Sequence, residues 1–306
     1  MEKIEAKRLL NATIDIGTNT VLLLIAEWNN GKIKTIKDEA RIARLGEGLH
    51  QFPLFLLKAQ NRVLEVLKEY RALCDSLKVK KIAAVGTAAF RKSKNAPAFI
   101  ARAEKEIGIR IEIISGDEEA RLSFLSATRD FPERPNPVVL DIGGGSTEII
   151  SKENRVSLEL GSVVLTERHL KHDPPLDGEV RALSLEIDRT LSLRPKPYPL
   201  NPTLIALAGT VTTLSAIKQK LKVWDGAKVQ GSILTAADLA EMIPLFRRTT
   251  NEERKTIPGM IPGREDTLLA GTMILQAIMK KIKVDRVTVS DRGLRYGLFY
   301  EQFPYR

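Results

Sequence analysis

Two stretches of this sequence set an aspartate at the end of an apolar run and follow it with glycine and hydroxyl residues. Residues 12–26 read ATIDIGTNTVLLLIA, and residues 138–151 read VVLDIGGGSTEIIS. An apolar run of this kind is typical of a buried strand, so Asp15 and Asp141 are expected where a strand ends. The repetition predicts one chemical device that is used twice.

Glycine directly after a strand suits a site that binds phosphate. Without a Cβ, backbone N–H groups can approach phosphate oxygens and form a small anion-binding nest. The predicted donors are, in chain order, Gly17, Thr18, Asn19, Thr20, Gly143, Gly144, Gly145 and Ser146. The alternative is a pair of tight hairpin turns with nothing bound, which two matching loops make the less favoured interpretation.

The acidic residues of the two stretches predict a divalent cation. A carboxylate together with phosphate oxygens is the usual arrangement around Mg²⁺, which keeps several of its waters. Asp15, Asp141 and Glu148 are therefore candidate ligands of Mg²⁺ or another divalent cation. Glu148 is also a candidate to orient a water molecule that attacks the bound phosphate. Hydrogen bonding of these acids to loop amides is the alternative, and both roles can hold together.

The composition favours a soluble, cytoplasmic protein. With 306 residues, of which 43% are hydrophobic, the chain is long enough to bury two cores. We find no run of the roughly 18 apolar residues that a membrane span needs, and no apolar segment typical of a secretory signal. The single cysteine, Cys74, excludes an internal disulfide and is expected in a core.

The charge balance narrows the class of ligand. A net charge of +10, from 48 basic and 38 acidic residues, favours a polyanion. Aromatic residues make up only 5% of the chain and form no recognisable stacking platform, which argues against a specific nucleic acid partner. The histidines show no zinc spacing, and the serines lack the partners of a serine hydrolase.

The order of the expected elements argues for an α/β protein. Each glycine loop is followed by a hairpin meander, whereas a P-loop or dinucleotide fold would place a helix there. Helices and strands then alternate in both halves. The sequence therefore predicts two similar domains, residues 1–125 and 126–306, with a cleft between them.

These motifs resemble the exopolyphosphatase/guanosine pentaphosphate phosphohydrolase (Ppx/GppA) family over nearly the whole chain. The matching segments are TIDIGTNT (13–20), GTAAFRKSKNA (86–96), ISGDEEA (114–120), LDIGGGSTE (140–148), LGSVVLTE (160–167), GTVTTL (209–214), PGRED (262–266) and VSDRGLRYG (289–297). The resemblance implies two ribonuclease H-like domains of the actin-like ATPase superfamily. It also implies the short, two-domain form, in which the last helix packs on the first domain.

The resemblance implies roles for two residues of the first half. Glu119, in SGDEEA, is expected to act as the general base that activates water, and Glu148 is the competitor for that role. The alternative for Glu119 is an acid that favours the positive end of a helix. Arg91 is expected to bind the terminal phosphate through its planar guanidinium.

It also implies further phosphate contacts in the second half. Arg264 is expected near the mouth of the cleft, although a salt bridge to Glu265 or Asp266 is an equal alternative. Gly209 and Thr210 are expected to hold phosphate or the far end of the ligand.

The expected activity is hydrolysis of a phosphoanhydride. The substrates implied by the resemblance are inorganic polyphosphate, the 5′-γ-phosphate of pppGpp, or both, with ppGpp as a further ligand. A (p)ppGpp-binding sensor with little turnover and an actin-like ATPase or kinase are the alternatives. The chain is expected to bind no membrane and to be a monomer or a homodimer.

Overall fold

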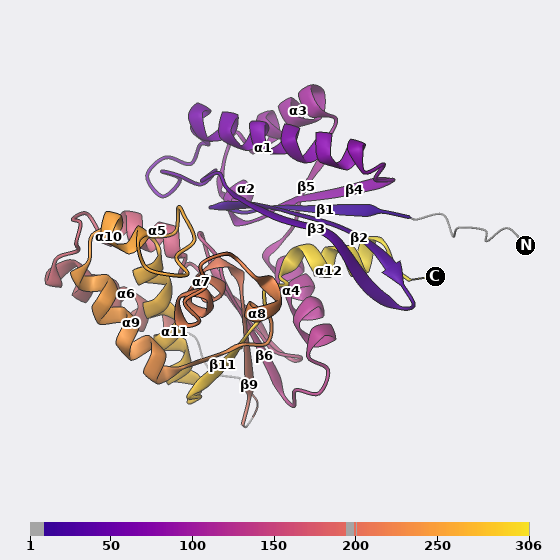
Figure 1. Cartoon of the computed structure of the whole chain (residues 1–306). Coiled ribbons are helices and arrows are strands. Elements are labelled where there is room, and N and C mark those ends of the chain that lie inside the picture. Colours follow the sequence, from indigo (N-terminus) through magenta and orange to yellow (C-terminus); the bar gives the residue numbers. More distant parts are fainter. Residues whose placement is uncertain (1–8, 194–198, 200, 306) are drawn as a thin grey trace, which may run out of the picture. The chain divides into compact units, whose positions relative to one another are not determined.

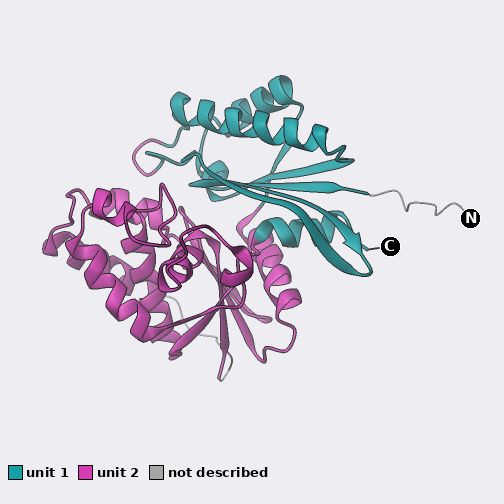
Figure 2. Cartoon of the chain, viewed as in Figure 1, with its two compact units in different colours: residues 1–49, 53–114, 294–306 teal, residues 50–52, 115–293 magenta. Residues whose placement is uncertain are grey.

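The structure is a computed structural model that describes residues 9–193, 199 and 201–305. Its elements group into two compact units (Figures 1 and 2). Unit 1 takes residues 1–49, 53–114 and 294–306, and unit 2 takes residues 50–52 and 115–293. The predicted boundary at residue 125 falls inside helix α4 (Gly116–Asp130), and the last helix, α12 (Leu294–Gln302), belongs to unit 1.

Unit 1 is built on a five-stranded sheet in the order β3-β2-β1-β4-β5. Its first three strands form an antiparallel meander, and β1 then pairs in parallel with β4. The strands are β1 (Asn11–Ile16), β2 (Thr20–Asn29), β3 (Lys32–Ile42), β4 (Lys81–Gly86) and β5 (Ile111–Ile113). Strand β3 pairs with β2 along its whole length, from Lys32 opposite Asn29 to Ile42 opposite Thr20.

Helices cover both faces of the unit 1 sheet (Figure 1). They are α1 (Leu57–Ser76), α2 (Ala88–Lys92), α3 (Ala96–Ile107) and α12. One face of α1 is buried and includes Cys74, as predicted. Burial raises the pKa of the Cys74 thiol to about 11, so this cysteine is an unreactive core residue. On the opposite face, α12 packs against β1, β2 and β4.

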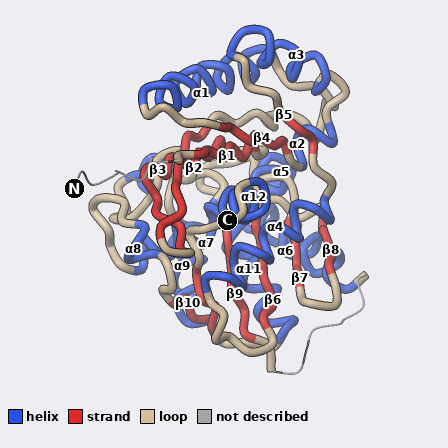
Figure 3. Tube along the Cα trace, turned by 90° about the vertical axis from the view of Figure 1, so that its right-hand side faces the viewer, coloured by secondary structure: helices blue, strands red, loops and turns tan. Residues whose placement is uncertain are grey.

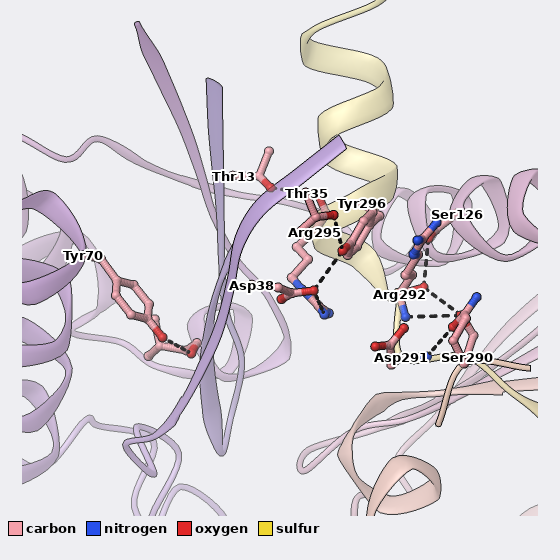
Figure 4. Close-up of polar contacts among 12 residues, drawn as sticks. Thr13, Thr35, Asp38, Tyr70, Ser126, Ser290, Asp291, Arg292, Arg295 and Tyr296 are labelled. Atoms are coloured by element: carbon pink, nitrogen blue, oxygen red, sulfur yellow. Dashed lines mark hydrogen bonds and ion pairs between the residues drawn. The ribbon is translucent and has the colours of Figure 1, made fainter. Parts of the chain in front are cut away.

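A polar anchor fixes α12 to unit 1 (Figure 4). Asp38 of β3 accepts hydrogen bonds from Arg295 Nε and Nη2, both at 2.8 Å, and from the Tyr296 hydroxyl at 2.9 Å. Thr13 of β1 donates from Oγ1 to the carbonyl of Arg295 at 2.8 Å. The last segment of the chain is thus an integral part of the first unit.

Unit 2 repeats the topology of unit 1. Its sheet has the order β10-β11-β9-β6-β7-β8, in which β6, β7 and β8 form the antiparallel meander and β6 pairs in parallel with β9. The strands are β6 (Pro137–Ile142), β7 (Thr147–Ile150), β8 (Arg155–Leu158), β9 (Thr203–Leu207), β10 (Ile233–Thr235) and β11 (Arg286–Val289). Strand β10, which pairs antiparallel with β11 at the edge, was not predicted.

The helices of unit 2 are segregated by face (Figures 1 and 3). They are α4, α5 (Ser162–His169), α6 (Asp177–Ser192), α7 (Ala208–Lys218), α8 (Gly226–Val229), α9 (Ala236–Arg248), α10 (Asn251–Lys255) and α11 (Leu268–Ile282). The main core includes Val138, Leu140 and Ile142 of β6 and the apolar faces of α6, α9 and α11. Val139, on the opposite face of β6, packs in a smaller core with residues of α4. The alternation along β6 therefore aims its odd-numbered residues at α4.

Candidate active site

Strand register places two acidic side chains next to each other in unit 2. Asp141 of β6 lies opposite Glu148 of β7, and Glu148 lies opposite Ser157 of β8. Residues directly opposite one another in an antiparallel pair share a face of the sheet. Asp141, Glu148 and Ser157 therefore form a row across three strands, on the face that α4 covers.

Helix α4 brings another acid and a hydroxyl to that row. The helix begins after Ser115, whose side chain accepts the N–H of Glu118 at 3.1 Å, as at a usual N-cap. Glu119 and Ser123 lie one turn apart and so share a face. Ser123 Oγ donates to Asp141 Oδ2 at 2.9 Å, and Ser157 Oγ donates to Glu148 Oε1 at 2.8 Å.

The electrostatics of this cluster are those of acids that repel one another in a low dielectric. Glu148 is 1% exposed, and burial, followed by the charges of Glu119 and Asp141, raises its pKa to about 8. Hydrogen bonds from Ser157 and Ser146 oppose that shift. Burial also raises the pKa of Asp141, against the hydrogen bond from Ser123. Such a cluster stabilises a cation or shared protons.

The glycine loop of unit 2 is a tight turn whose carbonyl groups are held by the first residues of α5. Gly143 N–H donates to Ser146 O at 2.9 Å and closes the hairpin, so this amide is engaged in the turn. The carbonyls of Gly143 and Gly144 accept N–H groups from the first residues of α5, at 3.0 to 3.1 Å. A Cβ at Gly161 would lie 2.2 Å from the carbonyl oxygen of Gly144, so only glycine allows α5 this approach.

The loop of unit 1 uses the same turn with different chemistry. Gly17 N–H donates to Thr20 O at 2.9 Å, as in the second loop. The residue opposite Asp15 is Leu22, so the position of Glu148 has no acidic counterpart here. Thr18 and Asn19 are buried, and within the described part of the chain no hydrogen-bond donor reaches Asn19 Oδ1.

Arg91 also belongs to unit 1. It lies in the last turn of the short helix α2, which follows β4. Its Nη1 donates to the carbonyl of Ile114 at 3.0 Å, just beyond the end of β5. This bond holds the guanidinium at the C-terminal ends of the parallel strands β4 and β5, where α/β sheets bind their ligands.

A second cationic group lies at the start of α7 in unit 2. The guanidinium of Arg264 sits against Gly209, where a Cβ would lie 1.9 Å from Arg264 Cζ. Burial lowers the pKa of Arg264 to about 10. A desolvated cation beside the N-terminus of a helix favours an anionic ligand.

Other contacts around Arg264 order the loop that carries it. Glu265, one of its two predicted salt-bridge partners, accepts the N–H of Gly263 at 2.6 Å. Thr210, the neighbour of Gly209, is buried against Gly271 of α11, and its side chain packs into the space that a larger residue at 271 would fill.

Unit 2 thus gathers many of the predicted residues, and unit 1 carries the rest. The acids Glu119, Asp141 and Glu148 form one cluster, and Gly209 contacts Arg264. The residues of unit 1 are Asp15, Gly17, Thr18, Asn19, Thr20 and Arg91.

Sequence reasoning missed three supporting residues: Ser123, Ser157 and Gly161. Only Gly161 left a signal, as the glycine of the LGSVVLTE segment. The two serines depend on strand register and helix packing, which the sequence does not reveal.

The acids of unit 2 suit a cation that arrives with phosphate. Among the residues that the structure describes, no group of at least three His, Cys, Asp or Glu side chains is arranged to hold a metal ion alone. Mg²⁺ commonly binds one or two carboxylates and takes its other ligands from water and substrate phosphates. Asp141 and Glu148, on neighbouring strands, fit that requirement. The third predicted ligand, Asp15, belongs to unit 1 and not to this pair.

Comparison with known proteins identifies the family to which this fold belongs. The two-sheet α/β fold is that of actin-like ATPases, as in the Ppx/GppA family member of Aquifex aeolicus, with 33% identity and a TM-score of 0.80 over 96% of this chain and 97% of that one. Residues 24–306 match the Ppx/GppA phosphatase family. The chain belongs to this family.

Two curated relatives carry names for different substrates. Exopolyphosphatase 2 of Mycobacterium tuberculosis is 34% identical over 307 residues, covering 94% of this chain and 96% of the relative. A guanosine-5′-triphosphate,3′-diphosphate pyrophosphatase of Pseudoalteromonas translucida is 28% identical, covering 99% of this chain but 61% of the relative.

No helix in the described ranges is long and apolar enough to cross a membrane.

Proposed function

We propose that this protein hydrolyses the terminal phosphoanhydride bond of inorganic polyphosphate or of the 5′-triphosphate of pppGpp. The observation that carries the proposal is the cluster of Glu119, Asp141 and Glu148 directly behind the glycine loop of unit 2. Acids beside a phosphate-binding turn suit the activation of water, because a carboxylate can accept its proton while the loop holds the phosphate.

Glu119 is the proposed general base. The attacking water forms a bond to the terminal phosphorus through its oxygen and gives a proton to Glu119. The bridging P–O bond breaks, orthophosphate leaves, and the shortened chain keeps the bridging oxygen. Glu148 is less suited to this role because its raised pKa, about 8, keeps it protonated at neutral pH in the protein without a cation.

The remaining residues have binding roles in the proposal. A divalent cation held by Asp141 and Glu148, with Asp15 as a further candidate, would offset the charge of the phosphates. Arg91 binds the terminal phosphate and stabilises charge that develops on its oxygens. The loop Gly17–Thr20, the loop Gly143–Ser146 and the start of α7 with Arg264 bind the rest of the phosphate chain.

Two observations favour polyphosphate over pppGpp as the main substrate. Exopolyphosphatase 2 is matched over 96% of its own length, whereas the guanosine-5′-triphosphate,3′-diphosphate pyrophosphatase is matched over 61% of its own length. The net charge of +10 also suits a long polyanion. Hydrolysis of polyphosphate is therefore the expected main activity, with pppGpp as a second substrate.

Release of orthophosphate from polyphosphate, pppGpp and ATP in parallel, each with Mg²⁺, tests this function. We expect release from polyphosphate, a slower release from pppGpp and little from ATP. Binding of ppGpp without turnover of any substrate would contradict the hydrolase and leave a nucleotide sensor. Turnover of ATP alone would point to an ATPase or kinase of the same fold.

A further inference from the structure

The segment that follows β3 holds the glycine loop of unit 1 in place. The carbonyl of Thr18 accepts the N–H of Gly46 at 2.9 Å. The carbonyl of Asn19 accepts the N–H groups of Ala43, at 3.0 Å, and Arg44, at 2.9 Å. Both peptide carbonyls at the tip of the loop are thus turned toward residues 43–46.

This attachment decides where the amides of the loop point. A peptide unit is planar and trans, so its C=O and N–H groups point in opposite directions. Fixing the carbonyl of Thr18 directs the N–H of Asn19 away from the segment, and fixing the carbonyl of Asn19 does the same for Thr20. Both N–H groups belong to the loop Gly17–Thr20, which the proposed function assigns to the phosphate chain.

The segment is in turn held by one side chain of helix α1. Arg62 Nε donates to the carbonyl of Ala43 at 2.9 Å, and its Nη2 donates to the carbonyl of Arg44 at 3.2 Å. Nη2 also donates to Glu47 Oε2 at 2.7 Å. The planar guanidinium thus makes contacts on both sides of Gly46, which a single ammonium group cannot reproduce.

These contacts form a continuous chain of peptide groups. The carbonyl of Ala43, which Arg62 binds, belongs to the same peptide unit as the N–H of Arg44, which binds Asn19. The peptide of Asn19 then ends in the N–H of Thr20. Hydrogen bonds in such a chain polarise one another, so the charge of Arg62 strengthens the last donor as well as orienting it.

The local backbone shows why the contacts of Arg62 with residues 43, 44 and 47 are needed. Arg44 has a φ of 50°, in the left-handed region that favours glycine. Gly46 approaches the loop so closely that a Cβ there would lie 2.3 Å from Thr18 Cγ2. A strained residue beside a close contact keeps its conformation only where its surroundings hold it.

We propose that Arg62 is a positioning residue for phosphate binding: it sets the direction of the Asn19 and Thr20 amides through the 43–46 segment. The inference rests on the proposed function, because it assumes that this loop binds the substrate's phosphates. Asn19 itself is buried at the tip of the loop, and no donor from the described residues reaches its Oδ1.

The test compares Arg62→Met and Arg62→Lys with Lys58→Met. Lys58 binds the same Glu47 at 2.6 Å from the preceding turn of α1, so its removal takes one cation from Glu47 but keeps both backbone contacts of Arg62. For both Arg62 variants we expect KM for polyphosphate to rise about tenfold with kcat changed less than about threefold, since uniform binding is lost. Lys58→Met should stay within about twofold of wild type.

Hydrogen exchange of the amides at residues 43–46 provides a readout that does not depend on activity. We expect faster exchange there in both Arg62 variants, and wild-type rates in Lys58→Met. Unchanged exchange, or faster exchange with an unchanged KM, would overturn the positioning role. Wild-type protein that neither binds tripolyphosphate nor releases orthophosphate would instead contradict the proposed function, and the inference with it.

Discussion

At the residue scale, the candidate site depends on backbone contacts as much as on acidic side chains. Glu148 is aligned with Asp141 by strand register, but the loop between them is shaped by carbonyl contacts with α5. Gly161 allows those contacts because it has no side chain. Substitution of Gly161 is therefore expected to lower activity, as substitution of an acid of the cluster would.

Gly161→Ala is expected to lower both stability and activity. Its Cβ would meet the carbonyl groups of Gly144 and Gly145 at 2.2 to 2.5 Å, so α5 or the loop must shift. We expect a loss of about 1–3 kcal/mol in the free energy of unfolding, as for overpacked sites, together with lower kcat/KM. Thermal unfolding and phosphate release measure the two effects.

Gly178→Ala is the matched control for that change. Gly178 lies in α6, and a Cβ there would meet no heavy atom within 4 Å. Alanine should therefore raise the free energy of unfolding by about 0.5–1 kcal/mol without changing activity. Equal behaviour of the two variants would show that the close approach of Gly161 does not constrain the loop.

At the scale of elements, the start of α6 carries a pH-dependent contribution to stability. Glu179 accepts the N–H groups of Lys171 and Leu176, both at 3.0 Å, and contacts His172 Nδ1 at 2.9 Å. Burial alone would raise the pKa of Glu179, but the hydrogen bonds from His172 and these amides outweigh burial and lower it to about 2.

Glu179→Gln is therefore expected to destabilise the protein at neutral pH and not at acid pH. A pKa lowered on folding stabilises the folded state above the unfolded value, near 4.5, and this contribution is lost as the pH falls toward 2. We expect a cost of about 1 kcal/mol at pH 7, similar to the loss of a helix cap. Thermal unfolding from pH 7 to pH 2, with exposed Glu241→Gln as control, measures it. A difference independent of pH would refute this account.

The elements themselves could be predicted from the sequence to different degrees. The two meanders follow from apolar periodicity and turn residues, and they were confirmed, as was the core position of Cys74. Strand β10 is only three residues long and is stabilised by pairing with β11. No local sequence pattern predicts that pairing. The alignment of Ser157 with Glu148 likewise depends on register.

At the scale of the whole molecule, the chain returns to its first unit with its last helix. Arg295 of α12, whose side chain is 9% exposed, is neutralised by Asp38 on β3. Trp28 of β2 packs against Phe299 and Tyr300 of the same helix. The sequence after Gly293 indicates a terminal helix, whereas the place of that helix in unit 1 was implied only by the family resemblance.

Asp38→Asn is expected to destabilise unit 1. The substitution leaves a buried guanidinium without its bidentate partner, which costs about 3–5 kcal/mol for pairs of this kind. Asp38→Asn combined with Arg295→Met should lose less than Asp38→Asn alone, because the orphaned charge is removed as well. Chemical denaturation of the single and double variants measures this, and a double variant at least as unstable as the single one would contradict it.

The central claim is that the acids of unit 2 hydrolyse a phosphoanhydride, with Glu119 as the base. The most direct measurement is kcat for orthophosphate release from polyphosphate by wild type, Glu119→Gln and Glu118→Gln. Glu118 is one residue away in the first turn of α4 and bonds to Arg121, so it is a matched control. We expect Glu119→Gln to lower kcat by about 10²–10⁴-fold, with Glu118→Gln close to wild type. Full activity in Glu119→Gln would contradict the account.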